Sequence, residues 1–168
     1  MIYTFVQYTL DKNNKGEHCN KCLDLVGDDD WVLFIDSDMI FTTNNWLKQC
    51  YQAIEENPEV KMFSGVTNRT GCNLQKAEVD ESTDDLAYHF KKGEEIYNSK
   101  SGVKLFDPNS FWRVSAFMLL IEKRAWEKAG KFRNGHQGTD NDIHQKFINH
   151  DIPVGIITNL YVYHRRIR

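Results

Sequence analysis

A chain of 168 residues, of which 40% are hydrophobic and 12% aromatic, can bury one substantial core, so we expect a single domain over residues 1–168. Its 21 basic and 24 acidic residues give a formal charge of −3, which argues against a general nucleic-acid binder with a strongly basic face. The sequence contains no apolar run of bilayer-spanning length and no N-terminal signal pattern. We therefore expect a cytoplasmic protein without a transmembrane segment.

The four cysteines are few for this length and favour a reduced compartment. Two of them, Cys19 and Cys22, form a C-x-x-C pattern, which occurs in metal and redox sites. The chain has no second C-x-x-C to complete a zinc site. Cys19, Cys22, Leu23 and Val26 follow helical spacing, so we interpret them as an apolar helix face packed in the core.

Apolar patterning in the first part of the chain alternates between strand and helix. In chain order we expect a strand over residues 2–8, a helix over 17–26 capped by Asn13 or Asn14, a strand over 31–35, a helix from 46 that ends before Pro58, and a strand over 60–66. The strand at 31–35 is apolar without a break, so both of its faces must be covered. Alternating elements of this kind indicate an α/β sheet.

The second part of the chain is less regular. Residues 70–109 are polar and charged without firm periodicity, which predicts short elements or a lid. We then expect a strand over 111–121, a helix over 124–129 closed by Gly130, a helix over 140–149 and a strand over 154–162.

Two carboxylates, Asp36 and Asp38, directly follow the buried strand at 31–35. Like charges this close raise each other's pKa unless a positive group neutralises them. Mg²⁺ and Mn²⁺ prefer oxygen ligands and combine one or two carboxylates with substrate phosphates. In open α/β sheets ligands bind at the carboxyl ends of the strands. The pattern favours a divalent cation that carries a nucleotide diphosphate; the structural alternative is a turn that only caps a loop.

Several motifs occur in an order that resembles the GT-A glycosyltransferases of family 2. Their segments are the N-x-G-like residues 13–16, Asn20, the D-D-x-D-like residues 30–38, the strand, helix and glycine turn of 117–132, the E-D-x-D-like residues 138–142, and residues 161–164. The chain departs from the pattern at Lys131, which replaces a second glycine, and at Thr139, which replaces a glutamate. It also lacks the extra strand and helix that family members carry before the N-x-G segment.

This resemblance implies a GT-A-type three-layer α/β/α sandwich around a mainly parallel sheet, with a nucleotide-binding half over about 1–69 and an acceptor half over about 70–168. It implies metal-dependent transfer of a sugar from a nucleotide-diphosphate sugar to a hydroxyl group, with inversion and with Mn²⁺ or Mg²⁺ as the cation. A glycan, a lipid-linked sugar, a protein and a modified nucleic-acid base all remain open as the acceptor.

The resemblance also implies roles for single residues. Asp38 is the expected direct metal ligand, Asp36 holds the metal, a metal-bound water or the ribose, and His164 is a third ligand. Alternation along the last strand places Val162 and His164 on one face, although a terminal histidine is often only a surface residue. Asp140 corresponds to the catalytic base, and helix capping is the structural alternative for it.

The remaining candidates lie on the nucleotide side. Contacts with the base, sugar or phosphates are expected from Tyr8, Thr9, Asn13, Lys15, Asn20, Asn68 and Arg69. An ordinary solvated surface is the alternative for Lys15 and Arg69. Trp112 is a candidate for stacking on an acceptor sugar or for the core, and His136 for a closing loop.

Two other functions fit parts of the sequence. A nucleotidyltransferase also binds nucleotide and metal on an α/β sheet, but it needs a glycine-rich basic loop after the first strand, and only residues 12–16 approach one. A non-catalytic nucleotide- or sugar-binding domain agrees with the short N-terminal half.

Overall fold

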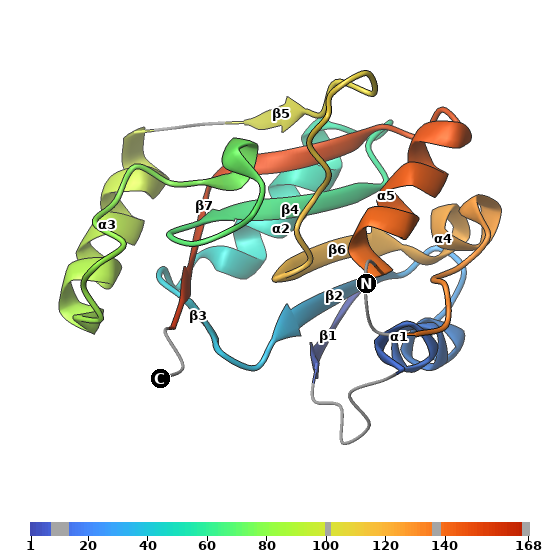
Figure 1. The fold of residues 1–168 in the computed structure, drawn as a ribbon, viewed down its shortest axis with the longest axis horizontal. Coiled ribbons are helices and arrows are strands. Elements are labelled where there is room, and N and C mark those ends of the chain that lie inside the picture. The colour runs from blue at the N-terminus through green and yellow to red at the C-terminus, as the bar shows by residue number, and fades with distance from the viewer. Residues whose placement is uncertain (8–13, 100–101, 136–138, 166–168) are drawn as a thin grey trace.

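The computed structural model describes residues 1–7, 14–99, 102–135 and 139–165 of the chain. In these ranges helices and strands alternate along most of the sequence (Figure 1). The elements are β1 (Ile2–Gln7), α1 (Lys15–Asp24), β2 (Trp31–Asp36), β3 (Met39–Phe41), α2 (Trp46–Glu56), β4 (Met62–Thr67), the 3₁₀ helix η1 (Asn73–Gln75), α3 (Leu86–Ser99), β5 (Val103–Leu105), β6 (Met118–Glu122), α4 (Lys123–Ala129), α5 (Thr139–Asn149) and β7 (Val154–His164).

The strands form one sheet in the order β1-β2-β6-β4-β7-β3, and β5 also pairs with β7. Parallel pairing occurs between β1 and β2 and between β4 and β7. The strand β6 lies between β2 and β4 and runs opposite to both, which makes the sheet mixed. Because β6 is antiparallel to both β2 and β4, these two strands run in the same direction. Their parallel partners β1 and β7 share this direction, so the carboxyl ends of all four strands lie along one edge of the sheet.

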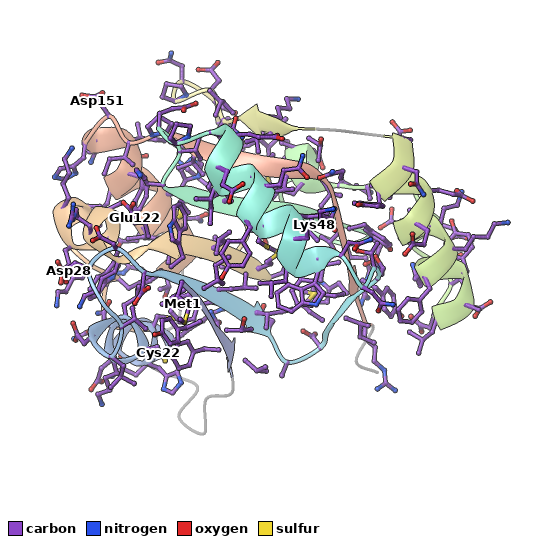
Figure 2. All side chains as sticks on the ribbon, turned by 180° about the vertical axis from the view of Figure 1, so that it is seen from behind. Met1, Cys22, Asp28, Lys48, Glu122 and Asp151 are labelled. Atoms are coloured by element: carbon purple, nitrogen blue, oxygen red, sulfur yellow. The ribbon has the colours of Figure 1, made fainter. Side chains whose placement is uncertain are left out.

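The strand β2 is covered by helices on both faces, so the fold has three layers. Its side chains at residues 31–35 are all buried, as the unbroken apolar run predicts. Val32 and Phe34 pack in the cluster that contains α1, α4 and α5, whereas Leu33 and Ile35 pack in the cluster that contains α2. Figure 1 shows α1, α4 and α5 in front of the sheet, and Figure 2, seen from behind, shows α2 across its other face with Lys48 labelled on it.

Most of the expected elements lie close to their predicted ranges. The structure adds β3 and the long helix α3, and it shortens the strand expected over 111–121 to Met118–Glu122. Gly130 ends α4 in the left-handed conformation with a φ of 96°, as predicted for a helix terminator. None of the helices in the described ranges has both the length and the apolarity needed to cross a bilayer.

The cysteine pair lies in the core. Cys19 is 1% exposed and Cys22 is 6% exposed, and both pack with Leu23 and Val26 in one cluster, which confirms the predicted apolar face. Burial raises the pKa of the Cys19 thiol to about 12, which disfavours the reactive thiolate.

Candidate functional site

The two carboxylates and the histidine predicted as metal ligands lie at the carboxyl ends of β2 and β7. Asp36 is the last residue of β2, Asp38 is in the turn that follows, and His164 is the last residue of β7. In the antiparallel pair of β3 and β7, Met39 lies opposite His164. The turn that contains Asp38 therefore lies beside the end of β7. Strand order thus brings together side chains that are far apart in sequence.

Asp38 and His164 are in direct contact. Asp38 Oδ2 lies 3.2 Å from His164 Nε2, and the backbone N–H of Arg165 donates to the Asp38 carbonyl at 3.0 Å. On the other side of the ring, His164 Nδ1 lies 3.0 Å from the Arg69 carbonyl oxygen. Because a carbonyl only accepts, Nδ1 carries the proton, and in the neutral ring the lone pair of Nε2 faces the carboxylate.

Two acceptors that face each other fit a cation between them. The two atoms are 3.2 Å apart, close enough that one small cation would contact both of them. A hydrogen bond from the other ring nitrogen to a carbonyl is the usual support for a metal-binding histidine. A carboxylate suits both Mn²⁺ and Mg²⁺, whereas an imidazole is a ligand of transition metals more than of Mg²⁺, so this pair favours Mn²⁺.

Asp36 is placed differently from the expectation of three grouped ligands. Its Oδ1 is 3.1 Å from Lys15 Nζ, so a side-chain ammonium already balances this carboxylate. Among the described residues, no group of three or more histidine, cysteine or acidic side chains is arranged to hold a metal. The three expected ligands are thus divided between two contacts, Asp38 with His164 and Asp36 with Lys15.

A cavity of about 160 Å³ lies beside the Lys15–Asp36 pair. Its walls are formed by Gln7, Lys15, Cys19, Ala116, Leu119, Phe132, Thr139 and Asp140. The Asp140 carboxylate accepts the backbone N–H groups of Ala116 at 3.3 Å and Asn141 at 3.0 Å. Asp140 therefore faces the cavity and also lies in the first turn of α5, so the geometry is compatible with both a base and a helix cap.

Gln7 is a cavity residue that the sequence reasoning did not select. Its Nε2 lies 3.7 Å from Cys19 Sγ, and its buried Oε1 has no hydrogen-bond partner among the described residues. Its position offered a signal, because it ends β1 at the carboxyl edge of the sheet, where ligands bind.

Three other candidate residues, Asn20, Asn68 and Arg69, make hydrogen bonds within the fold. The Asn20 side chain binds the Trp126 indole at 3.1 Å and both the N–H and carbonyl of Phe132 at 2.9 and 3.0 Å. Asn68 exchanges hydrogen bonds with the His164 backbone, and Arg69 Nη2 donates to the His164 carbonyl at 3.0 Å. Asn20 thus holds the turn after α4, whereas Asn68 and Arg69 fix the end of β7.

Five candidate residues remain, of which the structure describes Trp112. Tyr8, Thr9, Asn13 and His136 lie outside the described residues. Trp112 is half-buried and packs against the main core cluster, which agrees with the alternative reading for it.

The glycine of the N-x-G segment is a packing requirement. A Cβ at Gly16 would lie 1.8 Å from the Arg133 carbonyl oxygen, and the Gly16 N–H donates to the Gly135 carbonyl at 3.0 Å. This contact fixes the start of α1, and hence Lys15, against the loop before α5.

We therefore expect Gly16→Ala to lower the free energy of unfolding by about 1–3 kcal/mol or more, because backbone must move to admit the methyl group. Urea unfolding followed by circular dichroism measures this loss. Gly71→Ala is the matched control, since no atom lies within 4 Å of its added Cβ. Equal stability of the two variants would contradict the close packing at Gly16.

Comparison with known proteins adds the family. Residues 5–130 match the family described as Glycosyl transferase family 2, a span that includes Lys15, Asp36 and Asp38 and ends before Asp140 and His164. None of the curated proteins searched matches the chain. The family match confirms the expected α/β fold of GT-A type, and members of this family are glycosyltransferases. The match covers most of the sequence, and the chain belongs to glycosyl transferase family 2.

Proposed function

We propose that this protein transfers a sugar from a nucleotide-diphosphate sugar to a hydroxyl acceptor, with inversion and with a divalent cation, Mn²⁺ or Mg²⁺. The observation that carries the proposal is the arrangement along one sheet edge. There the Asp38–His164 pair and the cavity between Lys15 and Asp140 lie at the ends of strands that point the same way.

Each of these residues has a defined task in the proposal. Asp38 and His164 hold the cation through Oδ2 and Nε2, which face each other. When bound, the cation neutralises charge on the departing diphosphate. Lys15 adds a positive charge beside the cavity, and its contact with Asp36 at 3.1 Å sets the position of its ammonium group.

Asp140 is the proposed general base. It takes the proton from the acceptor hydroxyl as that oxygen attacks the anomeric carbon from the face opposite the leaving diphosphate. The cavity supports this role because its lining combines Asp140 with Lys15. It also agrees with a division into a nucleotide-binding half over about 1–69 and an acceptor half over about 70–168, since each half contributes to the walls.

The proposal can be tested by measuring the melting temperature and donor hydrolysis with a panel of nucleotide-diphosphate sugars, with and without Mn²⁺. We expect at least one donor to raise the melting temperature only when Mn²⁺ is present, and the same donor to be hydrolysed slowly. A donor at 100 times its dissociation constant stabilises the folded state by about 2.7 kcal/mol, which is several degrees for a domain of this size. Indifference to every donor with Mn²⁺ present would exclude the proposed activity.

A second candidate is a non-catalytic nucleotide- or sugar-binding domain. The short N-terminal half favours it, because the chain lacks the strand and helix that family members carry before the N-x-G segment. Such a domain binds donor without turning it over, so the hydrolysis measurement separates the two functions. A nucleotidyltransferase would instead act on nucleoside triphosphates, which a second panel tests in the same way.

A further inference from the structure

A second cavity lies far from the acidic edge, where α5 ends and β7 begins. It has a volume of about 260 Å³ and is lined by Leu105, Phe106, Pro108, His144, Ile148, Asp151, Ile152, Pro153 and Val154. Asp151, labelled in Figure 2 at the end of α5, is exposed at its rim. Because β7 begins at Val154 and ends at His164, this cavity and the proposed metal pair are separated by roughly 30 Å of strand.

One side chain of this mostly apolar lining carries an unsatisfied polar atom. His144 is 1% exposed, and its Nδ1 accepts the backbone N–H of Val114 at 2.8 Å. Burial and the nearby Arg113 guanidinium lower the pKa of His144 to about 4, so the ring is neutral at pH 7. With Nδ1 accepting, the single ring proton is on Nε2, which has no hydrogen-bond partner among the described residues.

A buried donor without an acceptor is rare in folded proteins, because its hydration is lost without compensation. The Phe106 ring is nearly perpendicular to the His144 ring, at a centroid distance of 4.8 Å, and an N–H contact with an aromatic π face is weak compared with a hydrogen bond to oxygen. The cavity that the His144 ring lines is therefore the place from which an acceptor can come.

We propose that this cavity binds a small neutral apolar molecule with one accepting oxygen, which takes the Nε2–H of His144. An apolar cavity of about 150 Å³ holds benzene, so about 260 Å³ admits roughly ten non-hydrogen atoms. An aromatic ketone, aldehyde or ether has this size and chemistry. The Asp151 carboxylate at the rim disfavours acids. The proposal is independent of the sugar-transfer activity, because it concerns a separate cavity and a direct binding measurement.

Acetophenone and α-methylstyrene form a matched pair of probes with the same planar shape. Acetophenone has a carbonyl oxygen, which can accept a hydrogen bond, where α-methylstyrene has a methylene group, which cannot. The variant His144→Asn keeps an acceptor oxygen near the Val114 N–H and removes the Nε2–H. We expect both probes to bind the wild-type protein in competition, as followed by shifts of backbone amide resonances such as that of Val114. The ratio of ketone to alkene affinity should fall about tenfold in His144→Asn, the value of one neutral hydrogen bond.

Two further measurements keep the proposal testable if His144→Asn does not fold. Ile148→Phe fills the cavity from α5 and should abolish binding of both probes while thermal unfolding stays cooperative. In the unsubstituted protein, the Nε2 proton resonance should move downfield with the ketone and not with the alkene. The proposal would be overturned if neither probe binds at its solubility limit. It would also be overturned if the affinity ratio is unchanged in a folded His144→Asn, or if binding to Ile148→Phe is undiminished.

Discussion

Replacement of Asp140 by asparagine is expected to lower the rate of sugar transfer by about 10²–10⁴-fold and to leave donor affinity nearly unchanged. An asparagine side chain has the same shape, and its oxygen can still accept the Ala116 N–H that Asp140 accepts at 3.3 Å. It cannot take a proton from the acceptor hydroxyl. Single-turnover transfer rates and calorimetric donor titrations with Mn²⁺ measure the two quantities separately.

Asp142 supplies the matched control for this experiment. It lies in the same first turn of α5, so its charge contributes the same helix-end stabilisation, about 0.3–1 kcal/mol. Its carboxylate contacts Lys146 at 2.9 Å and is not part of the cavity lining. Asp142→Asn should lower the melting temperature slightly and keep transfer. If both variants lose transfer to the same degree, or if Asp140→Asn loses donor binding, Asp140 is a structural acid and the base lies elsewhere.

The parts of the fold that the sequence predicts well are those whose own side chains determine their surroundings. The apolar run at 31–35 requires cover on both faces, and the structure provides two separate clusters for its alternating side chains. The helix expected over 17–26 rested on four apolar residues at helical spacing, and all four are buried, although α1 ends at Asp24 and Val26 follows it.

Elements that depend on distant partners escaped the prediction. The buried positions of α3 are His89, Gly93 and Ile96, a set without an apolar stripe. His89 is buried because it stacks on Tyr163 at 3.9 Å and its Nδ1 lies 2.7 Å from the Tyr161 hydroxyl. Gly93 is required because a Cβ there would lie 2.2 Å from the Thr42 hydroxyl oxygen. No local pattern reveals either contact.

The segment before β6 illustrates the same limit. Residues 111–117 have strand-like composition, but the Val114 N–H donates to His144 and the Ala116 N–H to Asp140, both on α5. Side chains of a helix thus replace a neighbouring strand as hydrogen-bond partners. Since a strand is defined by its partners, composition alone could not exclude one here.

The sequence indicated which residues belong to the candidate site, but not which residues contact one another. The resemblance pointed to Asp38 and His164, and the structure brings them into contact across the sheet edge. It did not indicate that Lys15 balances Asp36, or that Asn20 binds the turn after α4. A motif identifies which residue types recur, whereas their partners depend on how the helices pack on the sheet.

The second large effect is expected for Asp38→Asn, which should weaken Mn²⁺ binding by about 100-fold or more and remove metal-dependent donor binding with it. Loss of a direct ligand should exceed the roughly 10- to 100-fold effect of changing an outer contact. Titration of Mn²⁺ followed by electron paramagnetic resonance measures the affinity. Asp84→Asn is the control, since Asp84 accepts the Tyr163 hydroxyl at 2.9 Å, and alternation along β7 places Tyr163 on the face opposite His164.

The metal-free stability of Asp38→Asn separates a cation site from a structural ion pair. If the Nε2 lone pair of His164 faces the Asp38 carboxylate, the asparagine N–H of the variant can donate to Nε2. The free energy of unfolding of the metal-free variant should then equal that of the unsubstituted protein or exceed it by about 0.5–1.5 kcal/mol. If His164 is instead a protonated partner of Asp38, the variant loses an ion pair and becomes less stable. In that case Mn²⁺ would not raise the melting temperature of the unsubstituted protein either. Stabilisation of the metal-free variant together with loss of Mn²⁺ binding is therefore the outcome that only a metal-holding pair produces.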